Sequence, residues 1–582
     1  MSVHYPTMMS KEELRAKLLQ PDEITGSEIL LRSLLLEGVD CVFGYPGGAV
    51  LYIYDAMHGN PDFHHILTRH EQGAIHAADG YARSSGKVGV CIATSGPGAT
   101  NLVTGIATAY MDSVPLVVIT GNVAKTVIGT DAFQEADITG ITMPITKHSY
   151  LVRDVKDLAR TIREAFHIAN SGRKGPVLID IPKDISNHTT VFHYPETVSL
   201  RGYNPTVQPN KLQVDKMLKA IEQAERPVIL AGGGVVYSNA SAELLEFVEK
   251  TRIPVATTLL GLGGFPSAHE LWMGMPGMHG TYTANKALQN CDLLINIGAR
   301  FDDRVTMKVE GFAPKAKNIV HIDIDPAEIG KIVATTIPCV GDVKTLLQYA
   351  NPLAKPAKSE AWIQEIQQNA KNYPLRYKDS DTVLKPQFVV EMIHETTKGE
   401  AIVTSDVGQH QMWVAQYYKF NHPRSWITSG GLGTMGFGFP SAIGAKMANP
   451  DRLVVSINGD GGMQMCSQEL AVCSINRIPV KIVVINNQVL GMVRQWQEII
   501  YDNRYSHIDL AGSPDFVKLA EAYGVKGLRA TNKDEARRVW QEAMNTDGPV
   551  LVEFVVRKGE NVYPMVTQGN TIDTMIMGDD DQ

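Results

Sequence analysis

The chain alternates between short apolar, β-branched runs and longer segments with helical spacing. Leu453–Ile457 and Val480–Ile485 are two such runs, separated by about twenty helix-compatible residues. This order predicts a βαβ unit with two parallel strands. Other runs of this kind are Cys41–Phe43, Val88–Ala93, Leu116–Thr120, Val177–Ile181, Val228–Ala231, Leu293–Ile297, Ile319–Ile324 and Ala401–Thr404. The whole pattern predicts an α/β fold of doubly wound parallel sheets.

Polar stretches that contain proline divide the pattern into three domains. A chain of 582 residues is long enough for several domains, because a domain usually takes roughly 100–200 residues. Thr25 and Glu28 form a capping box that predicts the first helix of the first domain. We expect an N-terminal extension over 1–23, domains over 24–190, 213–350 and 386–556, linkers over 191–212 and 351–385, and a tail over 557–582.

The first and third domains repeat one order of features. Thr94–Gly98 leads through a helical segment to Val114–Thr120, and Ile457–Gly461 leads in the same way to Ile478–Asn486. Both copies read strand, glycine turn, helix, proline, strand. Gene duplication and the shared physics of βαβ units each explain such a repeat.

Composition narrows the class of protein. The net charge is −8, and no cluster of lysine and arginine indicates nucleic-acid binding. No apolar run is long enough to span a bilayer. The six cysteines contain no Cys-x-x-Cys pair, so we expect reduced core cysteines and a cytoplasmic protein.

Polar side chains follow the two strands of the βαβ unit. Gly459-Asp460-Gly461 comes after the first strand, and Asn486-Asn487 ends the second. The carboxyl ends of neighbouring parallel strands meet at one edge, where open α/β sheets bind ligands. A carboxylate and an amide are hard oxygen ligands that suit Mg²⁺, and the glycines let backbone N–H groups approach a phosphate. The alternative is an aspartate turn and an asparagine cap without a ligand.

The segment from Gly459 to Asn487 resembles the thiamin-diphosphate motif, which starts in GDG and ends in NN. Further pieces fall in the order of that superfamily: Phe43–Gly48, Thr68–Ala74, Asp406–His410 and Ser429–Gly436. The chain therefore resembles the thiamin-diphosphate-dependent 2-oxoacid decarboxylases. That resemblance implies a pyrimidine-binding, a central and a diphosphate-binding domain.

The resemblance implies a cofactor site built from several of these segments. Glu71 would face the thiamin aminopyrimidine, where a carboxyl hydrogen-bonded to N1′ promotes removal of the C2 proton. Taken alone, Glu71 is more readily a glutamate that interacts with a helix dipole. The residues implied around thiamin diphosphate are Tyr45, Pro46, Gly47, Glu71, Gly408, Gln409, His410, Gly433, Met435, Gly459, Asp460, Gly461, Gly462, Gly491 and Met492. Those implied around Mg²⁺ are Asp460, Asn487 and the backbone carbonyl of Val489.

The central domain narrows the family. Gly298–Thr306, Gly274–Gly280 and Phe133–Glu135 resemble the catalytic subunit of acetohydroxyacid synthase, also called acetolactate synthase. The family's central domain binds FAD. The residues that match its FAD site are Gly232, Gly233, Gly234, Met278, His279, Gly298, Arg300, Asp302, Arg304, Asp323 and Asp342. The glycine run lacks the full dinucleotide-binding spacing, and Asp323 and Asp342 are also suited to cap loops at strand ends.

The resemblance implies a defined reaction. Pyruvate is decarboxylated on thiamin diphosphate, and the two-carbon unit passes to pyruvate or 2-oxobutyrate. The products, 2-acetolactate and 2-aceto-2-hydroxybutyrate, belong to branched-chain amino-acid biosynthesis. The residues implied at the reaction are Glu71, Phe133, Gln134, Lys183, Arg304 and Trp496. Implied partners are a second copy of the chain, in a homodimer or homotetramer, and a small regulatory subunit.

Arg304 and Trp496 carry the substrate predictions. Arg304 would bind the acceptor carboxylate with its guanidinium fork, although a salt bridge to Asp302 or Asp303 is an alternative. Trp496 would line the pocket for the acceptor's alkyl group.

Two kinds of protein compete with this interpretation: other enzymes of the superfamily, and a protein with the same fold that has no catalytic activity. The Arg300–Thr306 run speaks against a flavin-dependent pyruvate oxidase and against a flavin-free catabolic acetolactate synthase. Intact Glu71, Asp460 and Asn487 speak against a catalytically silent nucleotide-binding protein on the same fold.

Overall fold

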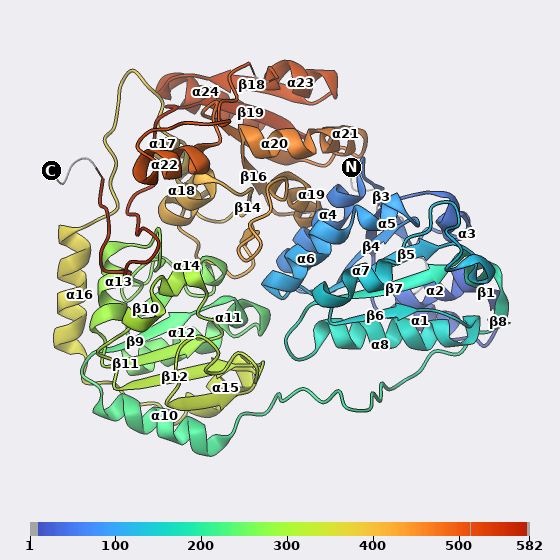
Figure 1. Ribbon diagram of the computed structural model, residues 1–582, viewed down its shortest axis with the longest axis horizontal. Helices are drawn as coiled ribbons and strands as arrows, with labels where there is room; N and C mark the ends of the chain where they lie inside the picture. The colour runs from blue at the N-terminus through green and yellow to red at the C-terminus, as the bar shows by residue number, and fades with distance from the viewer. Residues whose placement is uncertain (1–9, 513, 579–582) are drawn as a thin grey trace.

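The computed structural model describes residues 10–512 and 514–578, and three parallel sheets flanked by helices dominate it (Figure 1). Residues 1–9 of the predicted extension and 579–582 of the predicted tail lie outside the described part. The predicted fold class, α/β with three doubly wound parallel sheets, is confirmed.

The first sheet has the strand order β3-β2-β4-β5-β7-β6, with all its pairs parallel. Its strands are β2 (Cys41–Tyr45), β3 (His64–Leu67), β4 (Gly89–Ala93), β5 (Leu116–Asn122), β6 (His148–Leu151) and β7 (Pro176–Pro182). Its first long helix, α2 (Gly26–Leu36), starts at the predicted Thr25–Glu28 capping box. Both edge strands were missed from the sequence because their exposed, polar residues break the apolar runs.

The third sheet has the order β15-β14-β16-β17-β19-β18. Its strands are β14 (Ile402–Ser405), β15 (Trp426–Thr428), β16 (Val454–Gly459), β17 (Val480–Asn486), β18 (Lys526–Ala530) and β19 (Val550–Val555). Counted from the first strand of each sheet, the first and third sheets share one order, 2-1-3-4-6-5. The repeat seen in the sequence therefore extends to the complete sheets.

The central sheet has the order β10-β9-β11-β12-β13. Its strands are β9 (Pro227–Ala231), β10 (Val255–Thr257), β11 (Leu293–Ile297), β12 (Asn318–Asp323) and β13 (Ile337–Val340). A long irregular segment connects it to the first domain, and α16 (Glu360–Asn372) follows it on the way to the third (Figure 1). After β19 the chain returns to the central domain, where the Val566 N–H donates to the Met278 carbonyl at 2.8 Å.

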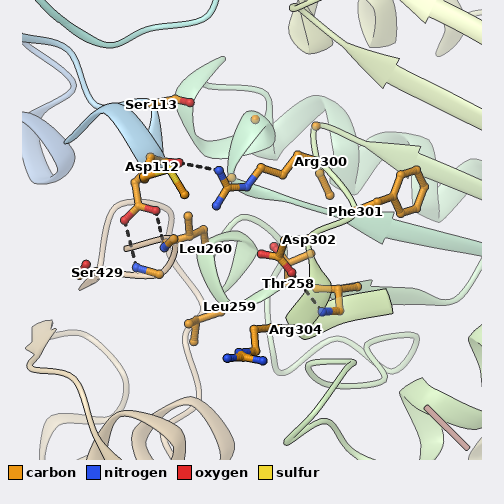
Figure 2. A pocket seen from close by; sticks show the side chains of 18 of the residues that line it. Asp112, Ser113, Thr258, Leu259, Leu260, Arg300, Phe301, Asp302, Arg304 and Ser429 are labelled. Atoms are coloured by element: carbon orange, nitrogen blue, oxygen red, sulfur yellow. Dashed lines mark hydrogen bonds between the residues drawn. The ribbon is translucent and has the colours of Figure 1, made fainter. Parts of the chain in front are cut away.

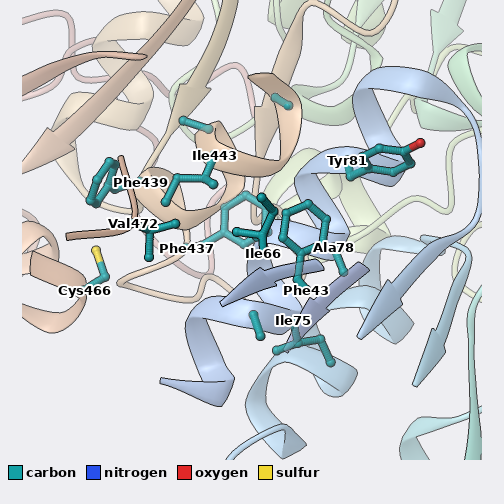
Figure 3. Packing of buried hydrophobic residues seen from close by; sticks show 14 of the residues in the cluster. Phe43, Ile66, Ile75, Ala78, Tyr81, Phe437, Phe439, Ile443, Cys466 and Val472 are labelled. Atoms are coloured by element: carbon teal, nitrogen blue, oxygen red, sulfur yellow. The ribbon is translucent and has the colours of Figure 1, made fainter. Parts of the chain in front are cut away.

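Two helices join the first and third domains. α4 (Glu71–Ser85) lies against α19 (Gly438–Ala448), and the aromatic and aliphatic side chains between them are buried (Figure 3). A Cβ added to Gly444 would lie 1.7 Å from the Ala77 carbonyl oxygen, and one added to Gly80 would lie 2.0 Å from the Ser441 carbonyl oxygen. Glycine is required on both helices for this close approach.

The structure also describes the state of the cysteines and the character of the helices. All six cysteines are buried and unpaired. Within 10–512 and 514–578, no helix has both the length and the apolar character needed to cross a bilayer.

Candidate active site

The loop after β16 carries the predicted metal ligand. β16 and β17 are neighbouring parallel strands, and Gly459 pairs with Ile485 at their carboxyl ends. Asp460 is the first residue of α20 (Asp460–Cys466), and Asn487 directly follows β17. The sheet thus brings the two predicted ligands to one edge, as the βαβ pattern predicts.

Asp460 is a buried carboxylate with a free oxygen. Its exposure is 2%, and Oδ2 has no hydrogen-bond partner. Burial raises the pKa of Asp460 to about 6, against backbone N–H groups that lower it. A buried and unsatisfied carboxylate oxygen is costly unless a cation or a proton completes it.

A chain of side-chain amides orients Asn487. Its Nδ2 donates to Gln409 Oε1 at 3.3 Å, so Gln409 fixes which end of the Asn487 amide carries the oxygen. Gln409 Nε2 donates in turn to Gln495 Oε1 and to the Glu560 carbonyl, both at 2.9 Å. Gln495 exchanges two hydrogen bonds with the backbone of Val562. The C-terminal segment is thereby tied to the candidate metal site.

A small cavity of about 100 Å³ lies over this edge of the third sheet. The predicted thiamin-diphosphate and metal residues that line it are Gly408, Gln409, His410, Met435, Gly459, Asp460, Gly461, Gly462, Asn487, Val489, Gly491 and Met492. Burial lowers the pKa of His410 to about 4, which keeps its ring neutral at pH 7, and its Nε2 has no partner. All residues that line this cavity come from the third domain.

A much larger cavity of about 860 Å³ adjoins the small one. The two share Val407, Gly408, Met435 and Met492 in their walls. The predicted FAD residues in its lining are Gly233, Gly234, Met278, His279, Gly298, Arg300, Asp302, Arg304, Asp323 and Asp342. Gly232 lies just behind them, since its added Cβ would be 2.3 Å from the Gly298 carbonyl oxygen. The volume falls in the range of cofactor pockets.

Three of the acidic residues in this lining also cap local structure. Asp302 caps α14 (Asp303–Thr306) by accepting from the Val305 N–H at 3.0 Å. Asp342 caps α15 (Val343–Ala350), and Asp323 accepts from the Asp325 N–H at 2.9 Å. Burial raises the pKa of Asp323 to about 6. Asp323 and Asp342 therefore do cap local structure, and both side chains also line the large cavity.

Arg304 and Trp496 also face the large cavity. Arg304 makes the alternative salt bridge, to Asp303 at 3.4 Å, but both side chains are more than half exposed. Such an exposed pair contributes about 0–1 kcal/mol, so it does not occupy the guanidinium firmly. Trp496 lies in α22 (Gly491–Ile500), which begins beside the small cavity.

The remaining predicted catalytic residues sit on the first domain and line neither cavity. Glu71 begins α4, and its Oε2 accepts from Asn101 Nδ2 at 2.9 Å. Gln134 has a positive φ of 59° and packs its backbone against Gly96, while Phe133 is 88% exposed. Lys183 begins α9 (Lys183–Asn187) and lies over the Tyr52 ring.

Tyr45, Pro46 and Gly47 are also on the first domain and in neither cavity lining. Within one chain, the first-domain residues are therefore not brought to the diphosphate edge.

The structure adds site residues that the sequence did not single out. Asp406 accepts from the N–H groups of Val407, Gly436 and Gly438, and so holds the loop that carries Met435. Asp112 accepts from Gly430 and holds the start of the same loop (Figure 2). Asp406 opens a recognised motif, which is a usable signal, whereas nothing local marks Asp112.

Two basic residues of the first domain in the lining of the large cavity were also missed. Arg173 and Lys174 line it, and burial lowers the pKa of Lys174. Arg300 donates from Nη1 to the Met111 carbonyl at 2.8 Å, which brings the first domain to the cavity rim (Figure 2).

Comparison with known proteins agrees with this geometry. Residues 24–141, 214–349 and 406–554 match, in order, the N-terminal TPP binding, central and C-terminal TPP binding domains of thiamine pyrophosphate enzymes. The acetolactate synthase large subunit of Haemophilus influenzae is 48% identical over 95% of this chain and 98% of its own. The chain belongs to the acetolactate synthase large-subunit family.

Two further relatives support the assignment. The acetolactate synthase of Mycobacterium bovis is 51% identical over 95% of this chain and 91% of its own. The acetolactate synthase isozyme 3 large subunit of Escherichia coli (strain K12) is 47% identical over 95% and 98%. The resemblance seen in the sequence is thereby confirmed, as is a thiamin-diphosphate-dependent enzyme.

Proposed function

We propose that this chain is the catalytic subunit of an acetolactate synthase. It decarboxylates pyruvate on thiamin diphosphate and passes the two-carbon unit to pyruvate or 2-oxobutyrate, giving 2-acetolactate or 2-aceto-2-hydroxybutyrate. The observation that carries the proposal is the unsatisfied, buried Oδ2 of Asp460 beside Asn487, in a cavity that shares wall residues with the one lined by Arg304 and Trp496.

The donor set at the small cavity fits Mg²⁺ and a diphosphate. Asp460 supplies a carboxylate oxygen, Asn487 an amide oxygen oriented by Gln409, and Val489 a backbone carbonyl. Such hard oxygen ligands leave positions on Mg²⁺ for phosphate and water. The glycines and the start of α20 provide backbone N–H groups for the phosphates.

The large cavity fits FAD, and we propose that it holds this cofactor. Gly232 and Gly234 pass close to the Gly298 backbone, and Gly233 and Gly234 line the cavity just after β9. Arg173, which pairs with Glu328 at 2.7 Å, and Lys174 also line this cavity and bring N–H donors to its wall.

Each substrate-facing residue has a separate task. Thiamin diphosphate, when bound, supplies the nucleophilic carbon and the electron sink for loss of CO₂. Glu71 would hold the proton shared with N1′ of the bound pyrimidine. Arg304 binds the acceptor carboxylate, and Trp496 contacts the acceptor's alkyl group. Gln134 and Phe133 of a second chain would lie near the reacting carbon, and Lys183 would lie at the substrate entrance.

These tasks require two chains, and we propose a homodimer or homotetramer with shared sites. Glu71 and the exposed Phe133 belong to the first domain, whereas the lining of the small cavity comes from the third. A second copy can bring its first domain to that cavity and cover Phe133. A small regulatory subunit is a further proposed partner, because relatives are named large subunits. The six reduced cysteines support a cytoplasmic location.

The direct test is an assay of the purified chain. It is incubated with pyruvate, thiamin diphosphate, Mg²⁺ and FAD, and acetolactate is measured with and without 2-oxobutyrate. We expect acetolactate formation that depends on both thiamin diphosphate and Mg²⁺. Acetyl phosphate or acetate formed only in air, without acetolactate, would instead identify an oxidase.

A further inference from the structure

Glu469 is a buried acidic residue that reaches from the third domain into the first. It lies in the 3₁₀ turn Ser467–Glu469, directly after α20, and its exposure is 0%. Both carboxylate oxygens accept from the backbone N–H of Arg69 at 3.1 Å. Arg69 lies two residues before Glu71, so the contact is made at the start of α4.

The neighbourhood of Glu469 is built around this contact. Burial raises the pKa of Glu469 to about 7, while hydrogen bonds from the Arg69 and His70 backbone act in the opposite direction. A Cβ added to Gly73 would lie only 2.4 Å from Glu469 Oε1. Glycine at this position in the first turn is therefore what lets the carboxylate approach α4.

The first turn of α4 has little other support of this kind. The side-chain cap within the chain is His70, whose Nδ1 accepts from the Gln72 N–H at 3.0 Å. The tight packing of α4 on α19 occurs further along, around Ala77 and Gly80. The start of a helix carries partial positive charge, so a carboxylate beside it stabilises the helix start, and Glu469 in addition holds the Arg69 backbone that leads into α4.

We propose that Glu469 is a positioning residue for Glu71. It binds the backbone just before Glu71 and thereby fixes where the Glu71 carboxyl lies. Glu469 follows directly on α20, which begins with Asp460, so one short segment of the third domain carries both a cofactor ligand and the support of the first-domain glutamate. This inference rests on the proposed role of Glu71 at the thiamin pyrimidine.

The experiment uses the full-length chain with Glu469→Gln. The amide keeps the size of the side chain, but it removes the charge and places an N–H₂ donor against N–H donors. Hydrogen–deuterium exchange with mass spectrometry should show faster exchange in the peptide containing Arg69 and His70, with or without cofactor. Exchange of the thiamin C2 proton in the holoenzyme should slow by about 100-fold, the typical cost of misplacing a catalytic group by about 1 Å.

Controls separate positioning from general damage. Half-saturation by Mg²⁺ and by thiamin diphosphate should stay at wild-type values, because Glu469 does not contact the small cavity. Gly73→Ala, which pushes on the same contact from α4, should reproduce both exchange effects. Glu164→Gln is the control. Glu164 is a buried carboxylate within the first domain that accepts from Tyr150 and Arg160, and its substitution should leave C2 exchange unchanged.

The outcomes distinguish this inference from the proposed function. Slow C2 exchange in Glu71→Gln, together with wild-type C2 exchange in folded Glu469→Gln, would overturn the positioning role alone. Slow C2 exchange in Glu469→Gln without faster amide exchange at Arg69 and His70 would also overturn it, because the effect would not pass through α4. Unchanged C2 exchange in Glu71→Gln would overturn the proposed role of Glu71, and the positioning role with it.

Discussion

Asp112 accepts a hydrogen bond of 2.7 Å from the backbone N–H of Gly431, so a helix of the first domain holds a glycine loop of the third. Asp112 ends α6 (Val103–Asp112), is 2% exposed, and also forms a salt bridge with buried Arg83 at 2.9 Å. Arg83 in turn donates to the Thr428 carbonyl at 3.0 Å. The loop that carries Met435 is thus placed by contacts that the third domain alone does not provide.

Asp112→Asn should destabilise the protein by about 2–3 kcal/mol, because it takes a charged acceptor from the Gly431 N–H and leaves Asp79 as the remaining buried acidic partner of Arg83. The measurement is thermal or urea unfolding beside Asp157→Asn. Asp157 pairs with Arg160 at 3.0 Å, but both side chains are more than half exposed, so its loss should cost about 0–1 kcal/mol. Equal effects of the two substitutions would show that the Asp112 contact contributes nothing special.

Asp460→Ala should raise the concentrations of Mg²⁺ and thiamin diphosphate needed for half-maximal activity, because it removes the charged metal ligand. The same variant should lose the thermal stabilisation that the two ligands give the wild type. Asp509→Ala is the control, since Asp509 is exposed and pairs with Lys558 at 2.9 Å. Half-saturation values identical to those of the wild type would refute the assignment of Asp460.

A mixture of inactive Glu71→Gln and inactive Asp460→Ala protein should regain activity once subunits exchange. If each site takes Glu71 from one chain and Asp460 from the other, a mixed dimer contains one fully native site. Activity is followed over time, and native mass spectrometry verifies exchange. Proven exchange without recovery would mean that each site is built within one chain.

Trp496→Leu should lower the preference for 2-oxobutyrate over pyruvate by about 10–200-fold at most, because one methylene contact is worth about 1–3 kcal/mol. A competition assay with both acceptors measures the product ratio. Trp540→Leu is the matched control, because Trp540 is 1% exposed in the core of the third domain and should lower stability without changing that ratio. A wild-type ratio with a lowered melting temperature in Trp496→Leu would make Trp496 a packing residue.

Asp180 should make stability fall as the pH rises. It is 1% exposed, and burial raises its pKa to about 7, above its ordinary value of 3.8, although Thr120 and Asn122 donate to it. The folded chain therefore binds this proton more tightly than the unfolded chain, and the resulting stability is full below about pH 4 and lost by about pH 7.

The check is the melting temperature of Asp180→Asn from pH 5 to pH 8. The melting temperature of the variant minus that of the wild type should become more positive with rising pH, because the variant has no carboxylate to bury in its charged form. The exposed Asp451→Asn serves as control. A difference that stays constant across this range would contradict the shifted titration.

The local sequence by itself determined the central strands and the edge of the sheet at which the polar segments meet. Apolar runs predicted β11 residue for residue and placed β16 and β17 as parallel neighbours. The GDG and NN segments then had to meet at one sheet edge, because parallel strands end on the same side. The short edge strands β3 and β6 escaped, since their pairing and not their composition makes them strands.

Only the tertiary structure decided how the domains support one another. Asp112 and Glu469 each bind backbone N–H groups of another domain more than 300 residues away in sequence. A carboxylate in a helix gives no local sign that it will meet such a partner, because the partner arrives through the packing of α4 on α19. The sequence thus determined which functional side chains stand at each strand end, and the packing of the domains determined which residues hold those segments in place.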